Sequence, residues 1–426
     1  MTDQPTDDLG AKPGAGDTVT PDDDRFAAFR NDRFLRYWLA RFLAAFAIQI
    51  VVVSVGWQVY DLTRDPWDLG LIGLCQFLPA LLLVLVTGAV ADRYSRRWIM
   101  GTTTFIEAFS VVGLMILTWE GVGSPAPIFA VLVVIGIARA FFGPASQSLV
   151  VNLVTRDELA NAIAWNSSSW QIASITGPVA GGLLYGLSPL GAYGTGAVML
   201  FVATGLILSI RAPAQRFENE PPSLQTIVAG FRFIWHEKVV LGAISLDLFA
   251  VLLGGAVALM PVYARDVLDV GPWGLGLLRA APGVGAVLVA LWLAAHPIKN
   301  NAGAIMFAFV AAFGAFTVVF GLSTAPWLSI VALALMGASD MISVYVRETL
   351  MQLWTPDEVR GRVNAVNMVF IGASNELGEF RAGAMASIIG AVPAVVLGGC
   401  ATVGVAGLWA YLFPDLRKAK RLAARE

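Results

Sequence analysis

The stretch Pro66-Trp67-Asp68-Leu69-Gly70-Leu71-Ile72 returns later in the chain as Pro272-Trp273-Gly274-Leu275-Gly276-Leu277-Leu278. A second stretch repeats in the same way, since Thr155-Arg156-Asp157-Glu158-Leu159 has a counterpart in Thr355-Pro356-Asp357-Glu358-Val359. Two separated segments that recur in the same order indicate a duplicated structural unit. The sequence therefore predicts two related halves in parallel orientation.

Apolar runs lie around and between these repeats along almost the whole chain. Of the 426 residues, 57% are hydrophobic and only 14% are charged, too apolar a balance for a water-soluble domain. Each run is about 20 residues long, enough for a helix to cross a hydrocarbon layer of about 30 Å, and lacks the alternating polarity of a transmembrane barrel. The prediction is an all-α membrane protein with twelve transmembrane helices in two six-helix bundles, near residues 37–60, 69–91, 97–119, 126–151, 160–186, 190–210, 239–263, 273–296, 302–323, 326–352, 363–389 and 392–413.

The positive charges assign the predicted segments to sides of the membrane. Arginines and lysines collect before the first span, between the second and third, in the middle of the chain and at its end. By the positive-inside rule these parts are cytoplasmic, both termini included. The predicted organisation is a disordered acidic cytoplasmic tail (1–24), an N-terminal bundle (25–210), a cytoplasmic linker with a short surface helix (211–238), a C-terminal bundle (239–413) and a basic cytoplasmic tail (414–426).

Two parallel repeats are the arrangement of transporters that bind substrate near the midplane and rock their halves around it. Alternating access is therefore the expected mechanism. The two cysteines, Cys75 and Cys400, both lie in apolar runs and form no metal-ligand cluster. We find no nucleotide-binding loop or nucleophile elbow, and predict neither an enzyme nor a protein that needs a cofactor, a metal or nucleic acid.

The junction of the second and third spans reads Gly88-Ala89-Val90-Ala91-Asp92-Arg93-Tyr94-Ser95-Arg96-Arg97. It resembles the signature loop of the major facilitator superfamily, G-x-x-x-D-R-x-G-R-[RK], with Ser95 at a position where glycine is usual. The resemblance implies a gating loop that latches the cytoplasmic face against the eleventh span in the outward-open state. Its residues would be Gly88, Asp92, Arg93, Arg96 and Arg97. The alternative is that the three arginines serve only the positive-inside rule.

Two further elements resemble motifs of the same superfamily. Gly177, Pro178, Gly181 and Gly182 match the G-P-x-x-G-G element of its antiporters, although the upstream glycines are missing and small residues at this spacing also suit plain helix packing. Arg139 resembles the intramembrane arginine of the fourth span. The span pattern and the segments 347–350 and 355–363 are most similar to the exporter branch that contains the enterobactin exporter.

Charged side chains inside the spans of the second half are candidates for proton coupling. Placing a charge at membrane depth costs about 2.5–3.5 kcal/mol, so such groups face protein or a wet cavity. Asp340 and Arg347 are seven residues apart and share a helix face, with Glu348 turned away; Glu376 lies at a depth similar to that of Asp340, so the two acids could share a cavity or a proton. The candidates are Asp340, Arg347, Glu348, Asn375, Glu376 and Glu379, with Asn364 and Asn367 in the same predicted polar stripe. A structural ion-pair network between spans ten and eleven is the alternative.

The first half carries its own candidates for the substrate cavity. Arg41, Gln76, Glu107 and Arg139 fall inside spans. Trp165, Asn166, Trp170 and Gln171 flank a run of serines and suit an amphipathic ligand, or a packed helix interface. Asp247 has no evident partner in the sequence and is a further candidate for proton coupling.

These observations predict a monomeric secondary active transporter in a cell inner membrane. It is expected to be coupled to protons and to export an amphipathic small molecule such as a siderophore or drug-like compound. The alternatives are a lysophospholipid flippase or metabolite importer of the same fold, and a receptor or scaffold that transports nothing. The expected partners are the small-molecule substrate, protons and membrane lipid.

Overall fold

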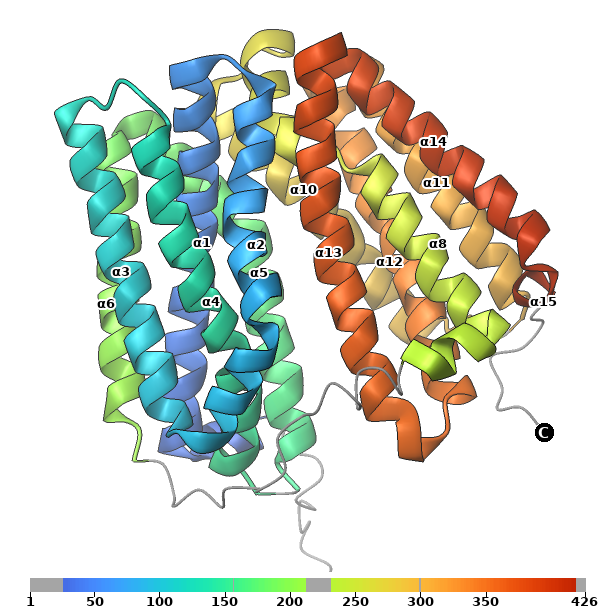
Figure 1. Ribbon diagram of the computed structural model, residues 1–426, viewed down its shortest axis with the longest axis horizontal. Coiled ribbons are helices and arrows are strands. Elements are labelled where there is room, and N and C mark those ends of the chain that lie inside the picture. The colour runs from blue at the N-terminus through green and yellow to red at the C-terminus, as the bar shows by residue number, and fades with distance from the viewer. Residues whose placement is uncertain (1–25, 156, 212–230, 299, 419–426) are drawn as a thin grey trace, which may run out of the picture.

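The computed structural model describes residues 26–155, 157–211, 231–298 and 300–418. A short 3₁₀ helix, η2 (Ala27–Arg30), leads into six long helices of the first half: α1 (Asp32–Thr63), α2 (Pro66–Arg93), α3 (Arg96–Glu120), α4 (Ala126–Leu153), α5 (Leu159–Leu187) and α6 (Pro189–Ser209). These six pack into one bundle, on the left of Figure 1. The predicted amino-terminal tail, most of the predicted linker and residues 419–426 of the predicted basic tail lie outside the described residues.

The second half forms the other bundle, on the right of Figure 1. Its first span starts as α8 (Lys238–Gly254) and continues through η3 (Val257–Leu259), α9 (Met260–Val262) and the π-helical η4 (Tyr263–Val267). The others are α10 (Gly271–Ala295), α11 (Ala302–Leu322), α12 (Pro326–Trp354), α13 (Asp357–Ile389) and α14 (Ala391–Leu412), followed by the short α15 (Pro414–Arg417). The described residues thus confirm an all-α fold with two sets of six spans.

Proline and capping residues set the helix starts. Asp65 accepts a hydrogen bond from the Trp67 backbone N–H, with Pro66 at the first position of α2, where its missing N–H costs nothing. Ser188 caps α6 in the same way, just before Pro189. The predicted span boundaries differ from the helix ends by at most six residues, the largest difference being at the start of α13, which begins at Asp357 and not at 363.

The seventh span is the exception to the predicted pattern. A continuous helix was expected over 239–263, but α8 stops at Gly254, and the next residue, Gly255, leaves the helical path. At Gly255, an added Cβ would lie 3.3 Å from the backbone of Gly378 on α13, so this glycine permits close approach of the two segments. The break allows Ala258 and Pro261 to face the middle of the protein.

Ten of the helical segments described are long and apolar enough to count as membrane spans by length and composition alone. The two long helices outside that count are α5 and α13, which carry the serine, asparagine, glutamate and arginine residues noted in the sequence. Because both helices pack against the opposite half, part of their surface contacts protein instead of lipid, which lowers the cost of their polar residues. The two long helices that fail this test therefore both lie at the interface between the halves.

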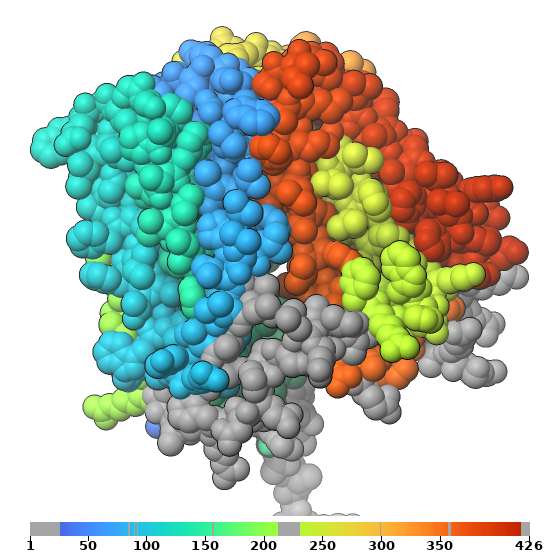
Figure 2. All heavy atoms as spheres, in the orientation of Figure 1, coloured from blue at the N-terminus to red at the C-terminus, as the bar shows by residue number. Residues whose placement is uncertain are grey.

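The two halves contact each other through two equivalent helix pairs, α2 with α13 and α10 with α5, which we call the seams. On one, Gly70 of α2 lies against Phe380 and Gly383 of α13; on the other, Gly276 of α10 lies against Pro178 and Gly182 of α5. Gly70 and Gly276 occupy matching positions of the repeated sequence, and glycine at both lets the helix backbones touch. Figure 2 shows α2 and α13 in contact in the upper part of the view.

At both seams, the paired helices diverge toward the same face of the protein. We call this the terminal face: α1 begins there, α6 ends there and α14 ends there, and the positive-inside rule predicts that it is cytoplasmic. Ile175 and Gly182 of α5 contact α10, but Gln171 and Ser168, next along the same helix face at spacings of four and three, are partly or fully exposed. Figure 1 shows the bundles close together at the opposite face and apart at the terminal face. The described helices of the two halves therefore make contact at the opposite face and diverge toward the terminal face.

Candidate functional site

A cavity of about 120 Å³ lies between the halves, where the two seams are still closed. Val52 and Gly56 of α1 form part of its wall, opposite Ala258 and Pro261 of the broken seventh span. Five of its lining side chains are polar or charged: Gln76, Arg139, Arg279, Glu376 and Glu379. Because the helices on both sides of the cavity belong to different halves, any rocking motion changes its shape.

The first half contributes an arginine held by two partners. The Arg139 guanidinium on α4 donates a 2.8 Å hydrogen bond to the side-chain oxygen of Gln76 on α2. Its Nε lies 3.9 Å from a carboxylate oxygen of Glu107 on α3, whose side chain is only 5% exposed. Three residues predicted from the sequence are thereby brought together: Gln76 and Arg139 line the cavity, and Glu107 lies behind them against Arg139.

The second half contributes two acids and an arginine. Glu376 lies against the backbone of α2, since a Cβ added to Gly73 would be 2.8 Å from its carboxylate. Glu379 is one helical turn further along α13 and interacts electrostatically with Arg279 of α10, while Glu376 interacts with Glu379 and with Arg139 across the interface. Arg279 was not among the residues predicted from the sequence, although an arginine inside an apolar run is itself a signal of a functional position.

The charges of this group do not cancel when all are ionised. Glu107, Glu376 and Glu379 supply three negative charges, and Arg139 and Arg279 supply two positive ones. Among the described residues, Glu376 has no ion-pair partner within 4.0 Å, whereas Glu107 pairs with Arg139. One proton would make the group neutral, and burial favours the neutral state of a carboxyl without a close cation.

A second charged group lies inside the C-terminal bundle. Arg347 on α12 forms an ion pair with Asp247 on α8, and its Nε lies 3.7 Å from Glu348. Asp340 interacts electrostatically with Asp247 and Arg347. The prediction that Asp247 lacks a partner is therefore wrong, because α8 and α12 are neighbours that the sequence alone does not bring together.

The predicted grouping of Asp340 with Glu376 is also wrong. Asp340 belongs to the group within the C-terminal bundle, while Glu376 borders the cavity between the halves. Nor do the polar residues of α13 form one stripe: Asn367 donates a hydrogen bond to Glu348, whereas Asn364 and Asn375 are exposed. Similar depth on consecutive spans does not decide which way two side chains point.

The polar segment of α5 divides into two parts. Trp165 packs against Phe26 and Phe29 of the amino-terminal segment and accepts, through its backbone oxygen, a hydrogen bond from Trp38. It belongs to a packed interface, as the alternative interpretation held, and Asn166 beside it is partly buried. Further along, Trp170 is 49% exposed and Gln171 is partly exposed. Arg41 of α1 is not part of this segment, and its guanidinium donates a 2.6 Å hydrogen bond to Ser146 Oγ on α4.

We predict that cysteines at Ser167 and Ser168 react with a membrane-impermeant maleimide applied from the terminal face, because both side chains are exposed there. The variants would be made in protein whose own cysteines have been replaced, Cys75→Ala/Cys400→Ala. The matched control is a cysteine at Ser169, whose side chain is 1% exposed. Labelling can be followed by mass spectrometry in inside-out vesicles. Equal labelling at positions 167, 168 and 169 would show that the bundles are not separated at this level.

The signature loop makes contacts within its own half. Arg96 donates to the backbone oxygen of Ser148, and Arg97 to that of Ile210, while Arg93 is exposed. Gly88 and Asp92 lie in α2, and the side chain of Asp92 is outside the described part of the structure. A latch against α13 stays a prediction for the outward-open state.

The glycines of the antiporter-like element lie at helix contacts. A Cβ at Gly177 or Gly181 would meet Gln49 or Ile50 of α1 at less than 3 Å, and Gly182 lies against α10. Pro178 is buried and its carbonyl lies against Gly276. Gly177 and Gly181 of this element therefore pack within the first half, and Pro178 and Gly182 form part of the α5–α10 seam.

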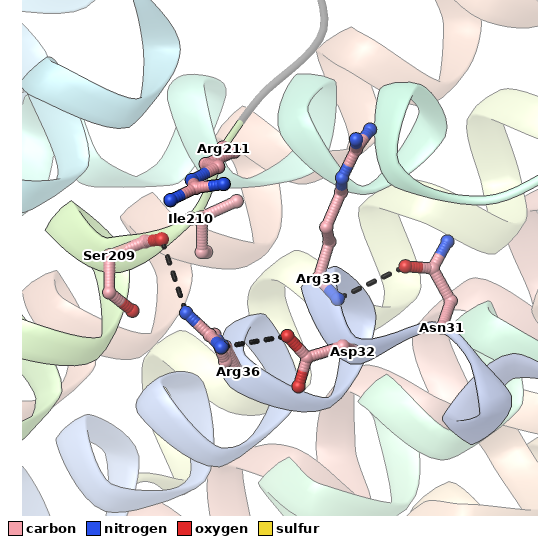
Figure 3. Close-up of a pocket in the computed structure, with 7 residues that line it drawn as sticks. All are labelled: Asn31, Asp32, Arg33, Arg36, Ser209, Ile210 and Arg211. Atoms are coloured by element: carbon pink, nitrogen blue, oxygen red, sulfur yellow. Dashed lines mark hydrogen bonds and ion pairs between the residues drawn. The ribbon is translucent and has the colours of Figure 1, made fainter.

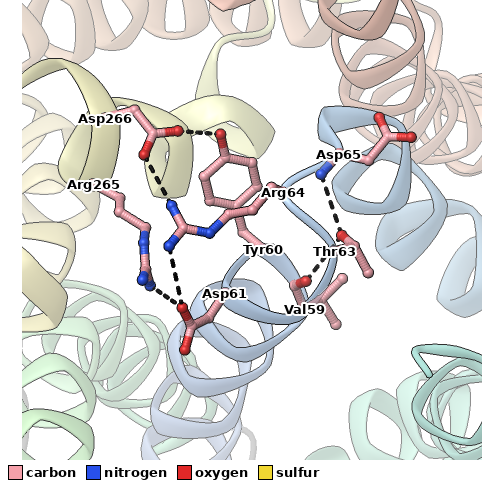
Figure 4. A network of polar contacts seen from close by, with 8 residues as sticks. All are labelled: Val59, Tyr60, Asp61, Thr63, Arg64, Asp65, Arg265 and Asp266. Atoms are coloured by element: carbon pink, nitrogen blue, oxygen red, sulfur yellow. Dashed lines mark hydrogen bonds and ion pairs between the residues drawn. The ribbon is translucent and has the colours of Figure 1, made fainter. Parts of the chain in front are cut away.

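Charged residues close the protein at that opposite face. Asp61 of α1 pairs with Arg265 of η4, and Arg64 lies 3.2 Å from Asp266, which also accepts a hydrogen bond from Tyr60 (Figure 4). Arg64 is the C-cap residue of α1 and adopts a left-handed conformation with φ of 56°, in which its backbone N–H donates a hydrogen bond to the Tyr60 carbonyl oxygen. Acids and bases from each half therefore hold the two halves together.

We predict that Asp61→Asn/Asp266→Asn weakens this closure and shifts the conformational equilibrium toward the outward-open state by about tenfold, as expected for the loss of two partly exposed pairs and a tyrosine contact. The measurement is the distance distribution between spin labels on α1 and α10 at the opposite face. Asp65→Asn/Asp68→Asn is the control, since it removes equal charge nearby without a contact to the other half. An unchanged distribution in the first variant would contradict the closing role.

Comparison with known proteins agrees with this architecture. A family model described as transmembrane secretion effector matches residues 24–425. The enterobactin exporter of Citrobacter koseri is 26% identical over 395 residues, covering 90% of this chain and 92% of that protein. The enterobactin exporter of Escherichia coli O1:K1 is 27% identical over 78% of this chain and 80% of its own length.

Solved transporter structures share the fold. A bacterial homologue of the human lysosomal transporter Spinster, in an inward-facing and occupied conformation, aligns with a TM-score of 0.71 at 15% identity, over 91% of this chain and 96% of that one. The POT family transporter PepTSo also gives a TM-score of 0.71, at 12% identity, over 91% of this chain and 98% of that one.

Fold and relatives together define a multi-pass transmembrane transporter of the major facilitator type. Within this class, the chain belongs to the transmembrane secretion effector family. The resemblance to the exporter branch is thereby confirmed, and the alternative of a receptor or scaffold without transport is set aside.

Proposed function

We propose that this protein exports an amphipathic small molecule across the inner membrane in exchange for protons. The observation that carries the proposal is the cavity between the halves, where two acids and an arginine of one half face an arginine of the other. Both termini would be cytoplasmic, so that the terminal-face opening corresponds to the inward-open state. A single chain supplies both walls of the cavity, which supports a monomeric unit.

Proton coupling follows from the division of charges between the halves. Arg139 belongs to the first half, whereas Glu376 and Glu379 belong to the second, so a rocking motion changes the distances that stabilise their charged forms. A proton taken up by Glu376 in one conformation is then released in the other, since conformation and protonation are linked equilibria. Substrate binding need only favour the opposite protonation state.

An amphipathic substrate is supported by a second hollow. An apolar groove of about 490 Å³ lies along the α5–α10 seam, lined by residues such as Phe46, Val179, Leu277 and Ile330 from both halves. It adjoins the exposed polar segment of α5 that includes Ser168 and Gln171. A molecule with polar and apolar parts could contact both surfaces. The relatives export enterobactin, and a siderophore of that kind is the substrate class we favour.

The proposal is tested by transport into inside-out vesicles that contain the protein. With an acidic interior, labelled enterobactin or a related catecholate should accumulate, and a protonophore should abolish the accumulation. Uptake that proceeds only into right-side-out vesicles would identify an importer. Transfer of a fluorescent lysophospholipid between leaflets, with no accumulation of soluble compounds, would identify a lipid flippase.

A further inference from the structure

A polar pocket of about 630 Å³ opens on the terminal face, away from the cavity between the halves. It lies where α1 begins and α6 ends, and its lining includes Arg33, Arg36 and Arg211 (Figure 3). Because both helices are membrane spans, their ends place the pocket at the boundary between hydrocarbon and water.

The pocket carries a positive charge. Three arginines and one acid, Asp32, line it, and Asp32 is paired with Arg36 at 2.8 Å. Arg36 also donates a 3.4 Å hydrogen bond to the backbone oxygen of Ser209, which fixes its guanidinium between α1 and α6. Arg33 and Arg211 are exposed, and within the described residues neither forms an ion pair within 4.0 Å. Two guanidinium groups are therefore available to a ligand of opposite charge.

The surroundings of the pocket resemble the headgroup level of a membrane. Trp98 is 56% exposed near the same end of the bundle, with the guanidinium of Arg97 over its ring at 5.4 Å, and Arg97 donates to the backbone oxygen of Ile210 at the pocket. Tryptophan is enriched at this depth because its ring is apolar and its N–H is polar.

An apolar stripe leads from the pocket into the membrane. Along α6, the exposed positions Ser209, Gly205, Val202 and Val198 follow at spacings of four, three and four, and so lie on one helix face. A side chain at Gly205 would meet nothing within 4 Å, so the stripe is a shallow track beside open space. A ligand anchored at the arginines could lay a hydrocarbon chain along it.

We propose that this pocket binds the phosphate of an anionic phospholipid from the leaflet at the terminal face. The guanidinium groups of Arg33 and Arg211 contact the phosphate in charge-assisted hydrogen bonds, and an acyl chain lies along the α6 stripe. Free phosphate offers the same charge, but it makes no use of the apolar stripe. The lipid therefore accounts for both parts of the site, and would hold the α1 and α6 ends together at the membrane surface.

The test compares lipid binding by full-length protein in neutral detergent, measured by native mass spectrometry with phosphatidylglycerol and phosphatidylcholine of identical chains. The wild-type protein should prefer phosphatidylglycerol by at least about tenfold, and Arg33→Gln/Arg211→Gln should lose most of that preference, since each arginine near an anionic headgroup contributes about fivefold. The control Arg362→Gln/Arg417→Gln removes equal charge from exposed positions on the terminal face of the other half and should keep the preference.

Several results would overturn the proposal. An undiminished preference in Arg33→Gln/Arg211→Gln would place lipid elsewhere, and displacement of the lipid by an equal concentration of glycerol 3-phosphate would identify a site for free phosphate. A large gain of lipid affinity in Asp22→Asn/Asp23→Asn/Asp24→Asn would make the acidic amino-terminal segment the occupant. If the double variant does not fold, Arg211→Gln alone is tested and should reduce the preference for phosphatidylglycerol by about fivefold. The charge-conserving variant Arg33→Lys/Arg211→Lys should bind phosphatidylglycerol as the wild type does.

Discussion

Glu376→Gln is expected to reduce transport driven by a pH gradient by about 100-fold, the upper range of measured coupling between sites. Glutamine keeps the shape and hydrogen-bonding capacity of the protonated acid but cannot release a proton. Because Glu376 has no ion-pair partner within 4.0 Å among the described residues, fixing it as neutral should leave the protein folded. Exchange of labelled for unlabelled substrate, with no gradient, needs only the conformational change and should persist.

Both activities would be measured in proteoliposomes on Glu376→Gln, on Glu379→Gln and on the control Glu120→Gln, an exposed acid at the end of α3. Glu379 interacts electrostatically with the buried Arg279 without forming an ion pair within 4.0 Å among the described residues, so its neutralisation should also remove counter-charge from this arginine and reduce thermal stability. If Glu376→Gln retains driven transport at the wild-type rate, the coupling proton is bound elsewhere, and Glu107 or Asp340 becomes the next candidate.

Asp247→Asn is expected to destabilise the C-terminal bundle by about 3–5 kcal/mol, because it leaves a buried guanidinium without its counter-charge. The side chains of Arg347 and Asp247 are only 4% and 12% exposed, so water cannot replace the lost partner. The measurement is a melting curve of the purified protein in detergent.

The double variant Asp247→Leu/Arg347→Met removes both charges and should recover most of the lost stability, since apolar residues of similar volume often replace a buried ion pair without loss. Asp340→Asn is the matched single control: it neutralises an acid of the same group that forms no ion pair within 4.0 Å among the described contacts. A melting temperature for Asp247→Asn equal to that of Asp340→Asn would mean that the ion pair does not stabilise the bundle.

The fold was predictable because its signals are local or periodic. Runs of about 20 apolar residues define the spans, and the repeat at residues 66 and 272 reveals the duplication. The repeat even anticipates the seams, since Gly70 and Gly276 are matching positions at equivalent contacts. Only the break after Gly254 escaped prediction, because a glycine pair in a membrane span also occurs in continuous helices.

The candidate site was predictable in part. Gln76, Glu107 and Arg139 were expected to face inward because charges avoid lipid, and they do meet. Which half-buried groups meet across helices depends on the packing angles between spans, and that information is not local in the sequence. Asp247 therefore seemed isolated, Asp340 seemed close to Glu376, and Arg279 was overlooked.

The pairing of substrate movement with proton movement is the central claim, and it is tested most directly by recording protons in proteoliposomes loaded with a pH-sensitive dye. With no imposed gradient, substrate moving outward through the protein should drive protons in the opposite direction, and the signal should vanish in Glu376→Gln. Substrate transport with no accompanying change of pH, in well-sealed vesicles, would contradict proton exchange as the driving reaction.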